Sequence, residues 1–301
     1  MPQNEPRRHH IQPRVLLKHF AGSDGRVLVV PRDRAKSPRL DKIDNVSVIN
    51  HANSIETDAG RDTELEKMLA QIEGHFPAII ERLDNDGRTD DDDRHIVALV
   101  AVQFARDPFN RAWVGETADL IYEALRFAIS EAYPDASSEY LQSELDHYGR
   151  NHIVMSHLEP HSENVAKAGT PYLIRKVFEE LSTLKVTVLH APSGGFFTAD
   201  SPVSLFDRYA LAGRSDEEAL WCGFQPETEI VLPVTSSRAV LLTTTCNERD
   251  IRANRSVIAI VNARTARAAA RNVYCHPDYP PQMLKIDMST WWWSRPITST
   301  L

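Results

Sequence analysis

One apolar stretch of the sequence carries two polar side chains where polar groups are unfavourable. Residues 95–106 are almost entirely apolar, and a helix over this range is apolar around most of its circumference. Gln103 and Arg106 fall among the apolar positions of that helix. A buried guanidinium without a partner is very unfavourable, so the fold has to bring an anionic group to Arg106. The fold either encloses a structural ion pair there or forms the floor of a site.

The composition is that of a globular chain. With 301 residues, 42% of them hydrophobic and 25% charged, the chain can bury a sizeable core. A formal net charge of −8 argues against a protein that coats nucleic acid non-specifically, although a local basic groove is compatible with it. No run approaches the roughly 18 apolar residues of a membrane span, so we expect no membrane partner.

The cellular setting is predicted from the cysteines and the N-terminus. Cys222, Cys246 and Cys275 are widely spaced, odd in number and match no metal-binding spacing. Residues 1–10 lack the apolar core of a signal peptide. Both observations predict a cytoplasmic protein.

Helical periodicity dominates the middle of the chain, and strand-like segments follow it. An apolar stripe predicts a helix over residues 62–83, with a kink at Pro77, and the helix over 95–106 follows it. The acidic run 90–93 between them is expected to cap the second helix rather than bind a metal. Further helices are predicted near 113–130, 138–148, 163–184 and 251–271, and strands near 26–31, 185–190, 196–199, 229–233 and 239–244.

This order of elements predicts an α+β fold. We expect a single domain over residues 1–301, with a helical middle at about 62–184, a strand-rich part at about 185–245, and a C-terminal helix and irregular tail over 251–301. The central helical layer should pack on a mostly antiparallel sheet that is built from the N-terminal hairpin and the C-terminal strands.

Glu73 is the predicted partner of Arg106. It lies at the edge of the apolar stripe of the first long helix and reaches Arg106 or Gln103 if the two helices pack antiparallel, which their short polar connection favours. The sequence is compatible with two roles for the Glu73–Arg106 pair: a structural ion pair or a catalytic pair. The fork of a guanidinium also suits a phosphate or carboxylate ligand, and Arg111 would extend such a subsite.

Several short motifs follow one another along most of the chain. They are His9-His10 with Pro13 and the run 16–21, the helix around 69–73, Gln103-Phe-Ala-Arg106-Asp-Pro108 with Arg111, Thr198-Ala-Asp-Ser-Pro202, residues 232–242, and the helix around Asn262. This ordered series resembles the bacterial family catalogued as domain of unknown function 4238. The resemblance spans about residues 8–275, and its motifs are specific as an ordered series. It implies membership of a family but no reaction.

Histidines and an aspartate are the further candidates for a site. Neighbouring side chains of a strand point apart, so only one of His9 and His10 should face a given site, as base or metal ligand. Asp200 ends a predicted strand and acts either in a site or as an ordinary turn cap. If a histidine, Glu73 and Asp200 converged, they could hold a divalent metal, with Arg106 neutralising a phosphate.

Other clusters have a surface or packing interpretation beside the functional one. Arg264, Arg267 and Arg271 are predicted to share one helix face, which could contact phosphates of a nucleic acid or pair with acidic side chains. The spacing of His152, His157 and His161 does not place all three on one helix face. The triplet 291–293 of tryptophans is expected to pack, with a homodimer contact as one outcome.

The sequence is therefore compatible with two functions. The first is a phosphodiester-cleaving enzyme, a nuclease of bacterial defence or toxin type, in which His9, His10, Glu73, Gln103, Arg106 and Asp200 are the catalytic set. The substrate-binding set of that enzyme would be Arg111, Arg264, Arg267 and Arg271. The alternative is a non-catalytic module that binds an anionic ligand or a protein partner, with the Gln103/Arg106 cluster as a structural ion-pair network.

Overall fold

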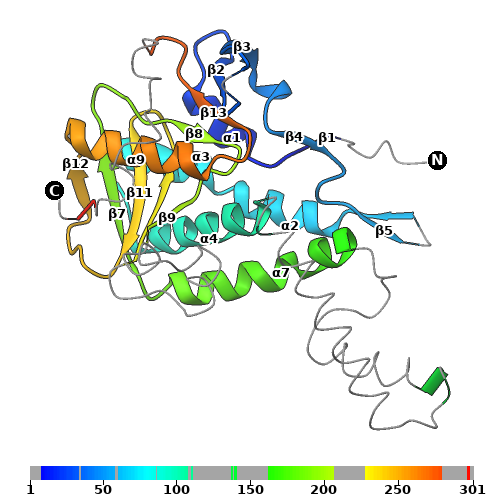
Figure 1. Cartoon of the computed structure of the whole chain (residues 1–301). Helices are drawn as coiled ribbons and strands as arrows, with labels where there is room; N and C mark the ends of the chain where they lie inside the picture. The colour runs from blue at the N-terminus through cyan, green and yellow to red at the C-terminus, as the bar shows by residue number, and fades with distance from the viewer. Residues whose placement is uncertain are drawn as a thin grey trace.

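The protein has an α+β fold in which helices and mostly antiparallel strands form separate layers (Figure 1). The computed structural model describes residues 8–33, 35–57, 60–85, 87–107, 110, 137, 139–140, 162–206, 228–279 and 297–298. The predicted helices near 113–130 and 138–148 lie outside these residues. Within them, no helix has the length and apolar character needed to cross a membrane.

A five-stranded sheet built from C-terminal strands forms the centre of the fold. Its strand order is β12-β7-β11-β10-β9, and all neighbours pair antiparallel except β12 and β7, which are parallel. The strands are β7 (Lys185–His190), β9 (Ser204–Phe206), β10 (Glu229–Pro233), β11 (Arg238–Thr243) and β12 (Asp250–Arg252).

Helices cover both faces of this sheet, which explains why its strands are apolar throughout. Val240 and Leu242 pack into a core with the long helices of the middle region, whereas Ala239 and Leu241 pack against the C-terminal helix α9 (Arg255–Ala268). Successive side chains of a strand point to opposite faces, so a strand that is covered on both sides needs an unbroken apolar run.

The middle helices form the layer on the first face. They are α2 (Glu64–Glu73), α3 (Phe76–Asp84), α4 (Asp90–Arg106) and α7 (Ser162–Leu181), and α4 runs alongside α7 in Figure 1. The single kinked helix predicted over 62–83 is wrong. The chain leaves the helix at Gly74–His75 and starts α3 with Pro77 in its first turn, where the missing N–H of proline leaves no hydrogen bond unmade.

A four-stranded sheet joins the N-terminal hairpin to C-terminal strands, in the order β3-β2-β13-β8. Its hydrogen-bonded neighbours are antiparallel. The hairpin was predicted to join the same sheet as all later strands, but the chain divides its strands between this sheet and the five-stranded one. The strands are β2 (Arg26–Pro31), β3 (Arg39–Lys42), β8 (Thr198–Ala199) and β13 (Asn272–Cys275).

Short elements fill the N-terminal region. The strand β1 (Arg8–His10) pairs with β4 (Val48–Asn50), and β5 (Ile55–Thr57) pairs with β6 (Gly60–Asp62), each as an antiparallel ribbon. Three short helical turns connect them: α1 (Arg14–Leu17), η1 (Lys18–Phe20) and η2 (Ile43–Asn45).

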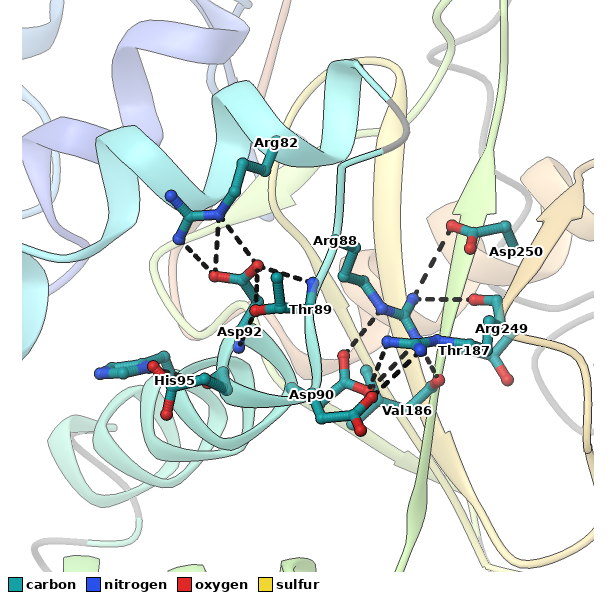
Figure 2. A network of polar contacts seen from close by, with 12 residues as sticks. Arg82, Arg88, Thr89, Asp90, Asp92, His95, Val186, Thr187, Arg249 and Asp250 are labelled. Carbon is teal, nitrogen blue, oxygen red and sulfur yellow. Dashed lines mark hydrogen bonds and ion pairs between the residues drawn. The ribbon is translucent and has the colours of Figure 1, made fainter.

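The N-terminus of α4 is tied both to α3 and to the five-stranded sheet (Figure 2). Thr89 and Asp92 form a capping box, and the Nε of Arg82 on α3 donates to both oxygens of Asp92, at 3.1 and 2.9 Å. Arg88 donates to the carbonyl oxygens of Val186 and Arg249, both at 2.8 Å. The predicted capping role of the acidic run is therefore confirmed, and α4 is fixed at its start.

The position of α4 depends on Asp92, whose pKa is held below its usual range chiefly by the hydrogen bond from Arg82. We expect Asp92→Asn to lower the unfolding free energy by about 1–2 kcal/mol at pH 7, as loss of a helix cap does. A lowered pKa contributes stability that is complete above the unfolded-state value of about 3.9 and is lost as pH falls. Urea unfolding at pH 7, 5 and 3 should show the gap to wild type closing below pH 4. The exposed neighbour Asp91→Asn is the control, and an equal loss in it would contradict the assignment.

Candidate functional site

Arg106 is enclosed and fully engaged at both terminal nitrogens. Only 2% of the residue is exposed, at the last position of α4. Its Nη1 donates to Oε1 of Glu73, which ends α2, and its Nη2 donates to the carbonyl oxygen of His10 at 2.7 Å. The predicted contact between Glu73 and Arg106 is confirmed. Through it and the His10 contact, the guanidinium links α2, α4 and β1.

Gln103 lies one turn before Arg106 and has no such partners. It is 2% exposed, and neither its amide oxygen nor its amide nitrogen has a hydrogen-bond partner among the described residues. The Nε of Arg106 is likewise without one. The two polar residues predicted among the apolar positions of this helix, Gln103 and Arg106, are therefore both enclosed in the protein and do not face an open cleft.

Glu73 is the partly solvated member of the pair. Its side chain is 21% exposed, and burial raises the pKa of its carboxyl while the charge and hydrogen bond of Arg106 lower it. Glu66, two turns earlier on α2, raises the pKa further. In this ion pair the Arg106 guanidinium is enclosed, whereas the Glu73 carboxylate is partly exposed to water.

The two histidines turn in opposite directions, as a strand requires. His9 is buried, and its Nδ1 accepts a hydrogen bond from the backbone N–H of Asn53 at 3.0 Å, so the ring carries its proton on Nε2. His10 turns the other way, with its Nε2 3.3 Å from the carbonyl oxygen of Ile43. Burial lowers the pKa of His10. Only the backbone of His10, and not its ring, meets Arg106.

The residues after β1 are held by a second set of polar contacts. The Nε2 of Gln12 donates to the hydroxyl of Thr198 on β8 at 2.5 Å, and its backbone N–H donates to the hydroxyl of Ser47 at 3.1 Å. The N–H of Ile11 donates to the carbonyl oxygen of Ser47 at 2.8 Å. We call residues 9–13 the N-terminal segment. It spans from Arg106 on one side to Thr198 on the other.

Asp200 caps the turn that leads from α9 into β13. Its two carboxylate oxygens accept hydrogen bonds from the backbone N–H groups of Ala270, Arg271 and Asn272 at 2.9–3.2 Å. Burial raises the pKa of its carboxyl, and the three backbone hydrogen bonds lower it. Asp200 therefore caps backbone amides, as one interpretation of the sequence had it, but these amides belong to a turn 70 residues away and not to its own Asp-Ser-Pro turn. The residue also lines a cavity.

A cavity of about 180 Å³ lies between the β1–β4 ribbon and the four-stranded sheet. Two residues predicted from the sequence, Asp200 and Arg271, line it together with Arg39 from the edge strand β3. Apolar and small polar side chains make up most of the remaining lining, namely Ile11, Val29, Asn45, Val46, Ser47, Val48, Ile49, Ala270, Asn272 and Tyr274.

Strand register explains why these distant residues meet. Arg39 pairs with Val29, Val29 with Tyr274, and Tyr274 with Thr198, so four side chains form one row across the sheet on the same face. The three that line the cavity are Arg39, Val29 and Tyr274, and Thr198 receives the hydrogen bond from Gln12. The N-terminal segment therefore lies over the row that forms the cavity floor.

Ser47 holds a strained position at the cavity wall. Its φ of 53° is in the left-handed region that residues other than glycine seldom adopt. The hydrogen bonds from Ile11 and Gln12 and a contact with Tyr274 fix it there. Strained backbone of this kind persists where surrounding contacts impose it and is concentrated at functional sites.

The predicted arginine stripe on the last helix is wrong. Arg264 is buried, its Nη2 lies 2.9 Å from Oε2 of Glu229, and its guanidinium stacks on Phe206 at 4.3 Å from the ring centroid. Arg271 lies beyond the end of α9, and Arg267 is exposed on the helix. A buried core arginine cannot contact a phosphate, because its charge is already neutralised inside the fold.

The predicted catalytic set does not converge as one site. His9 turns to Asn53, Glu73 is held by Arg106, and Asp200 is held by the turn before β13. Within the described ranges no group of three or more His, Cys, Asp or Glu side chains could hold a metal ion, so the proposed His–Glu–Asp ligand set is not assembled. Arg111, His152, His157, His161 and residues 291–293 lie outside the described residues.

Sequence reasoning missed Arg39, Ser47 and Tyr274. Each lies in a short segment with ordinary composition, and only strand pairing between residues more than 200 positions apart brings Arg39 and Tyr274 together. Gln12 was not a candidate either. Its place between the histidine pair and Pro13 is a signal that could have marked the N-terminal segment as part of the cavity wall.

Comparison with known proteins gives a family and nothing further. Residues 8–279 match the model of a family described as "Protein of unknown function (DUF4238)". No curated protein and no solved structure matches the chain.

We expect Arg106→Met to lower the unfolding free energy by about 3 kcal/mol, because it leaves Glu73 and the His10 carbonyl without their buried donor. The exposed Arg94→Met on the same helix is the matched control and should change stability by less than about 0.5 kcal/mol. Chemical denaturation at pH 7 measures both. Equal, small losses in the two variants would show that Arg106 is not a structural anchor.

Proposed function

This chain belongs to the DUF4238 family of unknown function, and from that premise we propose that it is a non-catalytic module that binds a small anionic ligand. The ligand site is the cavity between the β1–β4 ribbon and the four-stranded sheet. The Glu73–Arg106 pair is the structural network that holds one wall of this cavity in place. The observation that carries the proposal is the meeting of Arg39 and Arg271 at a cavity whose other polar lining is fixed by hydrogen bonds.

The enclosure of Arg106 favours a structural role for the cluster. Both terminal nitrogens are used inside the protein, and 2% of the residue reaches solvent. A ligand would have to displace Glu73 to reach this guanidinium. What the pair does supply is a fixed position for the His10 carbonyl, which is followed directly by the cavity residue Ile11.

The two cavity arginines supply the chemistry that an anion needs. Both are exposed, and the guanidinium of Arg271 has no ion-pair partner among the described residues. The Nε of the exposed Arg39 is 3.6 Å from Oδ2 of the partly buried Asp41, a contact that water and salt weaken at the arginine. The planar fork of arginine matches the oxygens of a carboxylate or phosphate, so two such groups at one opening favour an anionic ligand.

We expect inorganic phosphate and acetate to bind wild-type protein and to bind at least about tenfold more weakly to Arg271→Ala, since a charge-assisted hydrogen-bond pair is lost. Isothermal titration calorimetry at low salt measures this. Arg267→Ala, an exposed arginine outside the cavity lining, is the matched control and should bind as wild type does. Unchanged affinity in Arg271→Ala and Arg39→Ala together would rule out this cavity as the anion site.

The wider setting of this function is also proposed. Cys246 and Cys275 are both free and buried, which favours a reducing cytoplasm. A homodimer follows as a proposal from the tryptophan triplet, and a nucleic-acid partner from the exposed arginines Arg39, Arg267 and Arg271. The molecular mass in solution tests the homodimer. A salt-dependent shift in the gel mobility of labelled RNA or DNA tests the nucleic-acid partner.

Phosphodiester cleavage, as a nuclease of defence type with or without a divalent metal, is the second proposal. One observation favours it: Glu73 is a partly exposed carboxyl of raised pKa beside a buried guanidinium, the state that a general acid needs. Labelled RNA, single-stranded DNA and duplex DNA would be incubated with and without Mg²⁺ or Mn²⁺. This second proposal expects cleavage in wild type and loss of about a hundredfold or more in Glu73→Gln. Absence of cleavage under all conditions would contradict this second proposal.

A further inference from the structure

We propose that two copies of this chain pair through the strand β3, antiparallel and about a two-fold axis at Leu40, so that their four-stranded sheets join into one. The inference goes beyond the proposed anion binding and names a surface for the proposed homodimer. β3 is an edge strand, because among the described residues only β2 pairs with it (Figure 1). The partner that fits this edge is a second copy of the same chain.

The backbone of Leu40 faces the open edge of the sheet. Hydrogen-bonded and non-hydrogen-bonded residue pairs alternate along an antiparallel ladder. The N–H of Ile43 donates to the carbonyl oxygen of Gly25 at 3.1 Å, and the register then makes Leu28 and Leu40 a non-hydrogen-bonded pair. The N–H and C=O of Leu40 therefore point away from β2. An antiparallel partner strand centred on Leu40 would exchange two hydrogen bonds with them.

The charged side chains of β3 are complementary to those of a second β3. With the two-fold axis at residue 40, Arg39 lies opposite the partner's Asp41, and Asp41 lies opposite the partner's Arg39. Within one chain the Nε of Arg39 is 3.6 Å from Oδ2 of Asp41, so the four charges would alternate in sign around a square. Opposite charges that face each other across two strands stabilise the pairing, whereas like charges destabilise it.

On the other face of β3, Leu40 is an apolar side chain that the second copy would cover. It is 52% exposed, and Tyr140 is the only other large hydrophobic side chain that is exposed among the described residues. The register places Leu40 beside Leu28 and Leu28 beside Cys275, and the latter two belong to one hydrophobic cluster. In the pair, the two Leu40 side chains would meet and continue this apolar row from one sheet into the other.

The neighbouring residues restrict the pairing to this register. Pro38 has no N–H, and the N–H of Lys42 donates to Oδ1 of Asp41 at 2.9 Å, so neither residue supplies a donor that would lengthen the ladder. A two-fold axis at residue 39 would bring two arginines face to face, and an axis at residue 41 two aspartates. The pairing also closes on itself, because each β3 edge is covered by the other.

Reversed charges test this surface through the molecular mass in solution. Full-length wild-type protein should form a dimer in size-exclusion chromatography with light scattering over a concentration series. Arg39→Asp sets carboxylates opposite each other and Asp41→Arg sets guanidiniums opposite each other, twice across the axis. Each variant should therefore dimerise about tenfold or more weakly. Arg26→Asp, at an exposed arginine of β2 away from the edge, is the matched control and should dimerise as wild type does.

An equimolar mixture of Arg39→Asp and Asp41→Arg proteins decides the question. Every charge then faces an opposite one again, so the mixture should form a heterodimer although neither variant pairs with itself. Misfolded variants could not recover in this way. A mixture that stays monomeric, or a dimer that persists in both single variants, would overturn this surface. Wild-type protein that is monomeric at every concentration would refute the proposed homodimer as well, and neither result bears on anion binding at the cavity.

Discussion

The buried guanidinium of Arg106 is the contact on which the arrangement of this protein depends. It joins the ends of α2 and α4 to the backbone of β1. Transfer of the Arg106 guanidinium from water into the core is costly, so its buried position is stable only when both Glu73 and the His10 carbonyl are in place. The N-terminal segment is therefore held by the helical layer as well as by its own strand pairing.

The consequence reaches from the core to the cavity. Ile11 and Gln12 follow directly after His10, and their hydrogen bonds to Ser47 hold that residue in its left-handed conformation at the cavity wall. Gln12 also reaches Thr198, in the same cross-strand row as Tyr274 and Arg39. One set of contacts thus connects the structural network around Arg106 to the proposed ligand site. Arg106 can therefore affect ligand binding without touching the ligand.

Sequence patterns were sufficient for features that depend on local periodicity. The strands β10 and β11, the capped α4 and the Glu73–Arg106 pair all follow from apolar spacing and from the need to neutralise a buried charge. The covering of these strands by helices on both faces was not predicted. The cavity could not be predicted in this way, because Arg39, Ser47 and Tyr274 meet only through the register of strands that are distant in the chain. Arg264 shows the opposite limit: helical spacing placed it with exposed arginines, but Glu229 on a neighbouring strand draws it into the core.

The central claim is that Arg106 holds the N-terminal segment over the cavity, and residue-resolved amide hydrogen exchange tests it most directly. In Arg106→Lys protein we expect the amides of Ile11 and Gln12 to lose protection by a larger factor than those of Val231 and Leu241 in the central sheet. Lysine keeps the charge but cannot donate to Glu73 and His10 in the same fork geometry. An equal loss at all four amides, or none at Ile11 and Gln12, would contradict the claim.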